Sequence, residues 1–368
     1  MNIVHQKIID AVIAKSEKVC PDSLALIGVY GSVATGDEYD KSDLDLLILI
    51  QNDDGWKLGT GFILNDSSIG YDIYCTNWEG LQFDAECHHA HLSKLLDSEI
   101  VYVKNQQAIL ELSKLREQTR AFLNSEKRFQ RVHELFEKAK VSYANSHLHE
   151  SLGSVRMDAF EVVTCLLDAL MIYHGAYFKR GVKRTFEELA MLPVSEEFSD
   201  CLRKISASND ILEMRALLKN LLLYVENQIR QYNQREEPSE TLSGTYEEMY
   251  SNWRNKVEES AKRHDVFSAF MNMCSLQNMF SDISSEVNIG TFNMIESFNP
   301  DCLEDNVKLF DKYLAQYEEV YKRAGITVKR FSNVDAFAAD FLGGNHDGTQ
   351  DEFEAGAFCD DSKRKENH

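Results

Sequence analysis

Two aspartates stand inside an apolar run near the start of the chain, although a buried strand normally excludes carboxylates. The run reads "DLDLLILI" and begins with Asp43 and Asp45. Side chains alternate between the two faces of a strand, so both carboxylates project to one side while the leucines between them point into the core. Neighbouring carboxylates raise each other's pKa unless a cation neutralises them. Because Mg²⁺ combines one or two carboxylates with water and substrate phosphates, the pair predicts a magnesium site. The alternative is two solvated residues at the start of a strand.

A Gly-Ser pair, Gly31 and Ser32, ends the preceding apolar run "LALIGVYG". A turn of this kind gives backbone N–H groups room to approach a phosphate, and the hydroxyl of Ser32 adds another donor. The metal site and the phosphate cradle would then face each other. Ser42, directly before the aspartate pair, is a further candidate for contacting the nucleotide.

A third carboxylate, Asp72, lies in "IGYDIYCT", which together with "GFIL" and the turn "NDSS" predicts a β-hairpin. If the return strand lies next to the strand of Asp43, Asp72 completes a three-carboxylate cluster. Its expected task is to accept the proton of an attacking hydroxyl, or to hold a second metal ion that lowers the pKa of that hydroxyl. The alternative is a single aspartate that faces water.

The segment "GSVATGDEYDKSDLDLLIL", with a third Asp on a later strand, resembles the nucleotidyltransferase superfamily that includes DNA polymerase beta. It is especially similar to small antibiotic-modifying members, such as aminoglycoside and lincosamide nucleotidyltransferases. The resemblance implies that Gly31 and Ser32 hold the triphosphate. It implies that Asp43 and Asp45 bind Mg²⁺, and that Asp72 is a metal ligand or the base. ATP is the donor that the resemblance implies, because the motif itself binds phosphates and does not read a base.

A second resemblance lies in "LLDALMIYHGAYFKRGVKRTFEEL", which looks like the helical substrate-binding domain that follows the catalytic domain in this family. In that family a basic turn can reach the nucleotide phosphates. The densest basic cluster of the central region is formed by Lys179, Arg180, Lys183 and Arg184. We take Lys183 as the candidate for the triphosphate, the alternative being a solvated helix end whose cations offset the macrodipole.

The acceptor side of the cleft is expected on the same helical stretch. Acidic and aromatic residues recur there mostly at three- or four-residue steps, which could place them on one helix face. If the acceptor is cationic, Glu161 or Asp168 could pair with its amines. An ordinary charged face of an amphipathic helix explains the same pattern equally well.

Composition restricts the partners of the chain. With 60 acidic and 39 basic residues the net charge is −21, so a long polyanion such as bulk nucleic acid would be repelled. The eight cysteines contain no CxxC pair, and the cluster "ECHHAHL" has no second ligand pair at metal spacing, so we expect reduced thiols and no zinc ribbon. We expect a cytoplasmic protein without a membrane span or secretory signal. Whether it forms a homodimer stays open.

The periodicity predicts an α+β protein with a small mixed sheet followed by helices. The expected domains are a nucleotidyltransferase domain at 1–104, a helical substrate-binding domain at 105–235 and a further helical subdomain at 245–330. A linker, "REEPSETLSG", separates the last two, and an acidic tail follows at 343–368. Within the first domain, residues 79–96 are expected to be helical.

Together these features predict a Mg²⁺-dependent enzyme that transfers AMP, or another nucleotide, from a nucleoside triphosphate to a hydroxyl of a small acceptor, such as an aminoglycoside- or lincosamide-like antibiotic. One alternative keeps the chemistry but changes the target, because the catalytic segment also resembles antitoxins that transfer AMP to a partner toxin. The other alternative is a regulator that binds nucleotide without catalysis.

Overall fold

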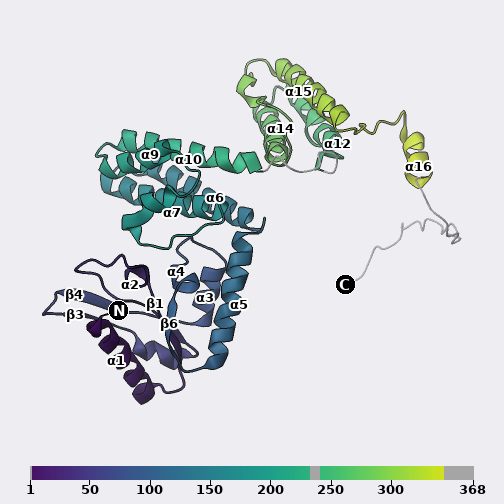
Figure 1. The fold of residues 1–368 in the computed structure, drawn as a ribbon. Coiled ribbons are helices and arrows are strands. Elements are labelled where there is room, and N and C mark those ends of the chain that lie inside the picture. Colours follow the sequence, from purple (N-terminus) through teal and green to yellow (C-terminus); the bar gives the residue numbers. More distant parts are fainter. Residues whose placement is uncertain (1, 233–240, 344–368) are drawn as a thin grey trace, which may run out of the picture. The chain divides into compact units, whose positions relative to one another are not determined.

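A computed structural model of the chain describes residues 2–232 and 241–343 (Figure 1). The chain separates into two compact units, with the division between Tyr232 and Asn233. Most of the predicted linker and nearly all of the predicted acidic tail lie outside the described residues. The first unit contains the sheet and the first group of helices, so the predicted domains 1–104 and 105–235 are parts of one compact unit.

The strands of the first unit form a mixed sheet and a separate hairpin. The sheet has the order β5-β2-β1-β6, in which β1 is antiparallel to β2 and β6, and β5 is parallel to β2. The hairpin consists of β3 and β4, as the sequence predicts. The bounds are β1 Leu24–Tyr30, β2 Asp45–Ile50, β3 Thr60–Leu64, β4 Ile69–Ile73, β5 Cys75–Thr76 and β6 Glu99–Val103.

Helices cover both faces of the sheet (Figure 1). On one face, α1 (Ile3–Val19) packs Ile9 and Val12 against the inward side chains of β1 and β2. On the other face lie α3 (Trp78–Ala85) and α5 (Gln106–Leu123), and their leucines join a core that contains Leu47 and Leu49 of β2. A 3₁₀ turn, η1 (Asp53–Leu58), follows β2.

The helix expected over 79–96 is broken in the structure. It consists of α3 and a single turn, α4 (Ser93–Leu96), with a loop between them in which Cys87 has a φ of +54°. The backbone of Ala90 explains the break. Its N–H donates to Asp168 at 2.9 Å, and its carbonyl accepts the N–H of Phe178 at 2.8 Å. The loop therefore binds the later helical region instead of continuing its own helix.

The remaining helices of the first unit pack around a second core, and two of them also reach the core of the sheet. Val132 and Leu135 of α6, and Ala169 and Met171 of α7, belong to the same cluster as the leucines of β2. This shared core explains why the sheet and these helices form one compact unit. The bounds are α6 Arg128–Leu148, α7 Leu152–Tyr173, η2 Val182–Arg184, α8 Thr185–Leu189, α9 Glu196–Ala207 and α10 Ile211–Tyr232.

The second unit is helical and has its own core, which is rich in aromatic side chains such as Phe280, Phe310 and Tyr317. Within the predicted helical subdomain 245–330, the first helical stretch contains a π-helical turn, labelled η3. One short helix, α16, lies beyond the predicted subdomain. The bounds are α12 Thr245–Met249, η3 Tyr250–Arg254, α13 Asn255–Lys262, α14 Val266–Glu286, η4 Ile295–Ser297, α15 Leu303–Arg323 and α16 Val334–Gly343.

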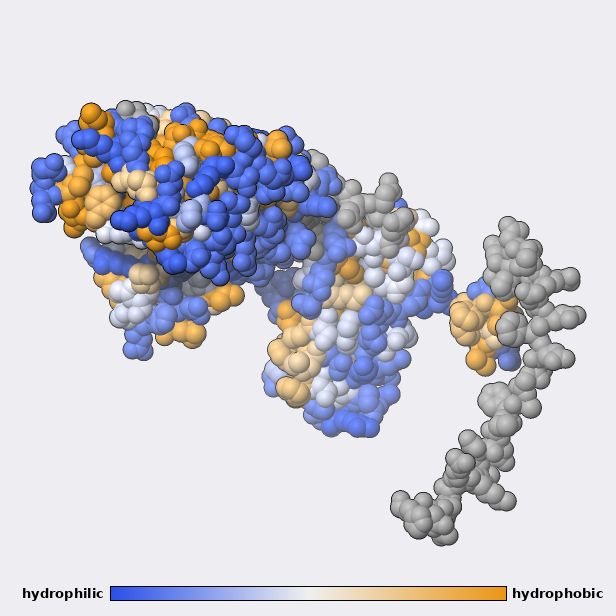
Figure 2. Space-filling view, turned by 90° about the horizontal axis from the view of Figure 1, so that it is seen from below, coloured by the Kyte–Doolittle hydropathy of each residue, from blue (hydrophilic) through white to orange (hydrophobic). Residues whose placement is uncertain are grey.

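The surface in view in Figure 2 is mainly hydrophilic, with apolar residues in separate patches. Among the helices that the structure describes, none combines the length and the apolarity needed to cross a bilayer. The seven cysteines within the described residues are unpaired.

Candidate functional site

A cavity of about 540 Å³ lies where α2 (Gly31–Thr35) and the start of β2 face the segment 179–183. Its wall includes all the nucleotide-binding candidates and two of the catalytic ones. These are Gly31, Ser32, Ser42, Asp43, Asp45 and Lys183. Residues that are far apart in the sequence therefore meet in one cavity.

The Gly-Ser turn and the aspartate pair are held together by strand pairing. Tyr30 at the end of β1 pairs with Asp45 at the start of β2, and the next residue, Gly31, has a φ of +67°. A Cβ on Gly31 would lie 1.9 Å from Oδ2 of Asp45, so any other residue here would displace that carboxylate. The backbone N–H of Ser32 donates a hydrogen bond to Asp45. The carboxylate thus occupies the space that the absent side chain leaves.

Carboxylates lie close together around the aspartate pair. Burial and the neighbouring Asp43 raise the pKa of Asp45, although the hydrogen bond from Ser32 lowers it. Burial and three nearby carboxylates, those of Asp45, Asp84 and Asp43, also raise the pKa of Tyr30. A hard divalent cation would relieve this repulsion, and the two carboxylates supply the oxygen ligands that Mg²⁺ prefers. The donor set therefore fits a magnesium ion.

Ser42 has a positioning role in the free protein. It is buried, its Oγ accepts the N–H of Tyr39 at 2.9 Å, and its own N–H donates to the carbonyl of Tyr39 at 2.8 Å. These bonds close a turn directly before Asp43. The hydroxyl proton of Ser42 is still available for donation into the cavity.

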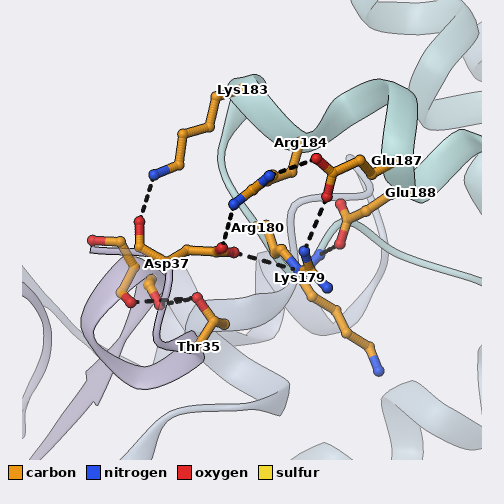
Figure 3. A network of polar contacts seen from close by, with 10 residues as sticks. Thr35, Asp37, Lys179, Arg180, Lys183, Arg184, Glu187 and Glu188 are labelled. Carbon is orange, nitrogen blue, oxygen red and sulfur yellow. Dashed lines mark hydrogen bonds and ion pairs between the residues drawn. The ribbon is translucent and has the colours of Figure 1, made fainter. Parts of the chain in front are cut away.

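The basic segment 179–184 contacts the loop after α2, as Figure 3 shows. Two arginines pair with the carboxylate of Asp37, Arg184 Nη2 at 2.8 Å from Oδ1 and Arg180 Nε at 3.5 Å from Oδ2. Both arginines also pair with Glu187. Lys183 differs, because its Nζ donates to the carbonyl oxygen of Asp37 at 2.5 Å and lies 5.1 Å from the ring centroid of Tyr39. Its charge therefore stays available to an anion.

A third side of the cavity was not predicted from the sequence. Asp84 is buried and lies 3.2 Å from Nε2 of His89 and 2.9 Å from Nζ of Lys94. Burial alone would raise the pKa of Asp84, but the hydrogen bonds with His89 and Lys94 lower it. His91 also lines the cavity and stacks on Phe178. In the sequence, His89 and His91 belong to the cluster "ECHHAHL", which is considered above only as a zinc site.

Asp72 is not among the residues that line the cavity. It lies exposed on β4 between Tyr71 and Ile73, which belong to the same core cluster as Leu46 of β2. Because Tyr71 and Ile73 pack into that core, Asp72 points to the opposite face of the hairpin. Within the described ranges, no group of three His, Cys, Asp or Glu side chains stands close enough to hold a metal ion. The structure thus does not gather the expected three-carboxylate cluster.

The two acceptor candidates on α7 are also outside this cavity. Asp168 is 4% exposed and accepts the N–H of Ala90, so it fastens the loop between α3 and α4. Burial raises the pKa of Asp168, although the Ala90 hydrogen bond and His91 lower it. Glu161 is exposed on the same helix and does not line this cavity. The expectation that these two side chains face the cleft is not met.

No protein-family model matches the chain, and no curated protein matches it. Among solved structures, it is similar to a nucleotidyltransferase-like protein from Exiguobacterium sibiricum 255-15, with 15% sequence identity and a TM-score of 0.32. The match covers 89% of this chain and 96% of that chain. Because both values are low, we take neither the fold nor the activity of this chain from that protein.

Proposed function

We propose that this chain is a Mg²⁺-dependent nucleotidyltransferase. It would move a nucleoside monophosphate from a nucleoside triphosphate, with ATP as the expected donor, to a hydroxyl of a small acceptor. The observation that carries the proposal is the cavity in which Asp43 and Asp45 meet the Gly31 turn and the basic segment 179–184. Carboxylates suited to a hard cation and donors suited to phosphates occur there within one wall.

Each part of the wall has a task in this reaction. Asp43 and Asp45 would hold Mg²⁺, which when bound neutralises phosphate charge and lowers the pKa of an attacking hydroxyl. The Gly31 turn lies in the cavity wall, where its backbone and the Ser32 hydroxyl would donate to a phosphate. Lys183 would exchange its bond to the Asp37 carbonyl for a phosphate oxygen, a stronger charge-assisted partner.

The transfer step needs a place for one proton. The acceptor oxygen forms a bond to the α-phosphorus while the bond from that phosphorus to the bridging oxygen breaks, and pyrophosphate leaves with the electron pair. The hydroxyl proton passes to a carboxylate, for which we propose Asp72, the third acid that the resemblance in sequence implies. Positioning and electrostatic stabilisation would supply most of the acceleration.

An aminoglycoside- or lincosamide-like acceptor, and with it a role in antibiotic resistance, follows only from the resemblance in sequence. The amine-pairing role expected for Glu161 and Asp168 has no support from their positions. The proposal therefore specifies a hydroxylated small molecule, and the same cleft could serve other acceptors.

The test is release of pyrophosphate from labelled ATP, GTP, CTP and UTP across a panel of hydroxylated antibiotics and metabolites. Asp43→Asn combined with Asp45→Asn should abolish release, because the cation loses both carboxylates. The matched control is Asp53→Asn combined with Asp54→Asn, two aspartates that are exposed in η1 and outside the cavity. Equal activity in the two double variants would contradict the assignment.

A further inference from the structure

A second cavity, of about 430 Å³, lies among the helices of the first unit. Its volume falls within the roughly 300–1,000 Å³ that is usual for small-molecule sites. Val182 lines this cavity and also the cavity of the aspartate pair, and its neighbour Lys183 lines the latter. We call the second one the helical cavity. It is lined by Arg156, Ala159, Phe160, Val163, Leu167, Val182, Thr185, Phe186, Leu202, Ile205, Ser206 and Met214.

The wall of the helical cavity is mainly apolar, and part of it is open to water. Leu202 and Met214 form its buried base. At its rim, Phe160 is 59% exposed and Val182 is 83% exposed. Apolar side chains exposed around a concave site commonly mark a binding surface, because a ligand that covers them removes apolar area from water.

Among the described residues that line this cavity, Arg156 is the only charged one, although the chain as a whole is acidic. The guanidinium of Arg156 is fixed by Oδ1 of Asn209 at 2.6 Å and by the carbonyl of Ser208 at 3.2 Å. Arg203 lies over the ring of Phe186, with 4.4 Å from its guanidinium carbon to the ring centroid, but its charge is paired with Glu196 and Asp200. The described residues that line the cavity include no aspartate or glutamate. A polycationic molecule would therefore find no carboxylate in this lining to pair with. A neutral or anionic apolar molecule would find apolar contacts and the cation of Arg156.

We propose that the helical cavity receives an apolar part of the acceptor, so that the acceptor is a neutral or anionic molecule carrying a ring system or an apolar chain beside its hydroxyl. This proposal rests on the proposed function. Val182 lies in the wall of both cavities, and in this proposal one molecule seats its apolar part among the helices and extends its hydroxyl toward the aspartate pair. Phe160 and Val182 are then specificity-determining residues.

The first experiment measures occupancy of the helical cavity in the full chain, with the fluorescent probe 1-anilinonaphthalene-8-sulfonate. Phe160→Asp should weaken probe binding at least about tenfold, because a charge at the apolar rim opposes burial of the naphthalene ring. The control is Met157→Asp, because Met157 is 62% exposed on the same helix and lines neither cavity. That variant should bind the probe as the wild type does. Equal binding by the wild type and both variants would overturn the proposal, as would complete displacement of the probe by Mg²⁺-ATP.

The second experiment measures pyrophosphate release with hydroxylated aromatic alcohols and with amino sugars. The aromatic alcohols should be used, and Phe160→Asp should raise their KM at least about tenfold with little change in kcat, since it removes binding that is equal in the ground and transition states. Met157→Asp should leave KM unchanged. Use of the amino sugars alone, or use of neither class, would overturn the proposal.

A separate titration with Mg²⁺-ATP distinguishes failure of the two proposals. If the wild type binds Mg²⁺-ATP through Asp43 and Asp45 but does not use aromatic alcohols, the acceptor proposal is wrong and the nucleotidyltransferase proposal stands. If Mg²⁺-ATP does not bind, the proposed function is wrong. In that case, the effect of Phe160→Asp on probe binding still shows whether the helical cavity binds an apolar molecule.

Discussion

The strand part and the helical part of the first unit differ in how far residue spacing determines where a side chain lies. Asp43 and Asp45 are two residues apart, and the alternation of a strand places both in one cavity wall. Glu161 and Asp168 are seven residues apart on α7 and share a helix face, but they lie about 10 Å apart along the axis. One is exposed and the other is covered by the loop of Ala90. A helical period predicts which face of the helix a residue occupies, but not which residues of other elements it contacts.

The largest expected effect comes from the strand part, where the geometry has least freedom. Gly31→Ala should reduce kcat/KM at least about 100-fold, because the new methyl group displaces Asp45 by more than an ångström. Steady-state kinetics would measure this. The control is Gly36→Ala, which has a similar φ of +71° but open space around its Cβ. It should cost about 1 kcal/mol of stability and change activity little. A similar loss of activity in both variants would mean that backbone strain, and not the Asp45 contact, explains the effect.

A substitution at Asp72 tests whether the strand part of the unit also supplies the proton acceptor. Asp72→Asn should lower kcat by at least about tenfold, because an amide cannot accept the hydroxyl proton. The affinity for Mg²⁺-ATP should stay within about twofold, since Asp72 lies outside the nucleotide cavity. Single-turnover kinetics and a binding titration would separate the two quantities. A smaller loss of kcat would show that another group accepts the proton.

A substitution at Lys183 tests whether the side of the cavity formed by the helical part binds phosphate. Lys183→Ala should raise the KM for the nucleotide about tenfold, because a charge-assisted bond to phosphate is lost. The control is Lys57→Ala, whose ammonium pairs with Asp54 in η1, away from the cavity. Equal KM values in the two variants would contradict a role for Lys183 in phosphate binding.

The smallest effects on catalysis are expected at the acidic residues of α7. Asp168→Leu should destabilise the protein by about 1–3 kcal/mol, because the buried N–H of Ala90 loses its acceptor. Glu161→Gln should change neither stability nor KM noticeably, since its side chain is exposed and outside both cavities. Thermal unfolding would measure the first effect, and kinetics the second. A KM change in Glu161→Gln without a change in stability would restore the cationic-acceptor hypothesis.

Strands, helices and the phosphate-side residues of the cavity could be predicted from the sequence because local patterns determine them. Continuous apolar runs indicate β1 and β2, and the Gly-Ser turn lies between them. The broken helix at 79–96 could not be predicted, since its cause is the bond from Ala90 to Asp168, 78 positions later in the chain. His89 of the same loop and Lys94 of the following helix α4 both line the cavity, and no local pattern indicates that arrangement. Long-range contacts determine the parts of the structure that sequence periodicity does not predict.

The central claim, that Asp43 and Asp45 form a cation site, makes a specific prediction about stability and pH. In the folded protein the pKa of Asp45 is raised, so the folded state binds its proton more tightly than the unfolded chain. Without metal, stability should therefore fall as pH rises from the ordinary carboxyl range through the raised pKa. A cation bound to the ionised pair should reverse this loss.

The most direct measurement is the thermal midpoint at pH 8 with a non-hydrolysable ATP analogue, in the presence of Mg²⁺ and in the presence of EDTA. The wild type should gain at least about 2 °C from Mg²⁺. The variant with both Asp43→Asn and Asp45→Asn should gain almost nothing, and without metal it should be more stable than the wild type. An equal gain in both proteins would contradict the assignment of the cation site to this pair.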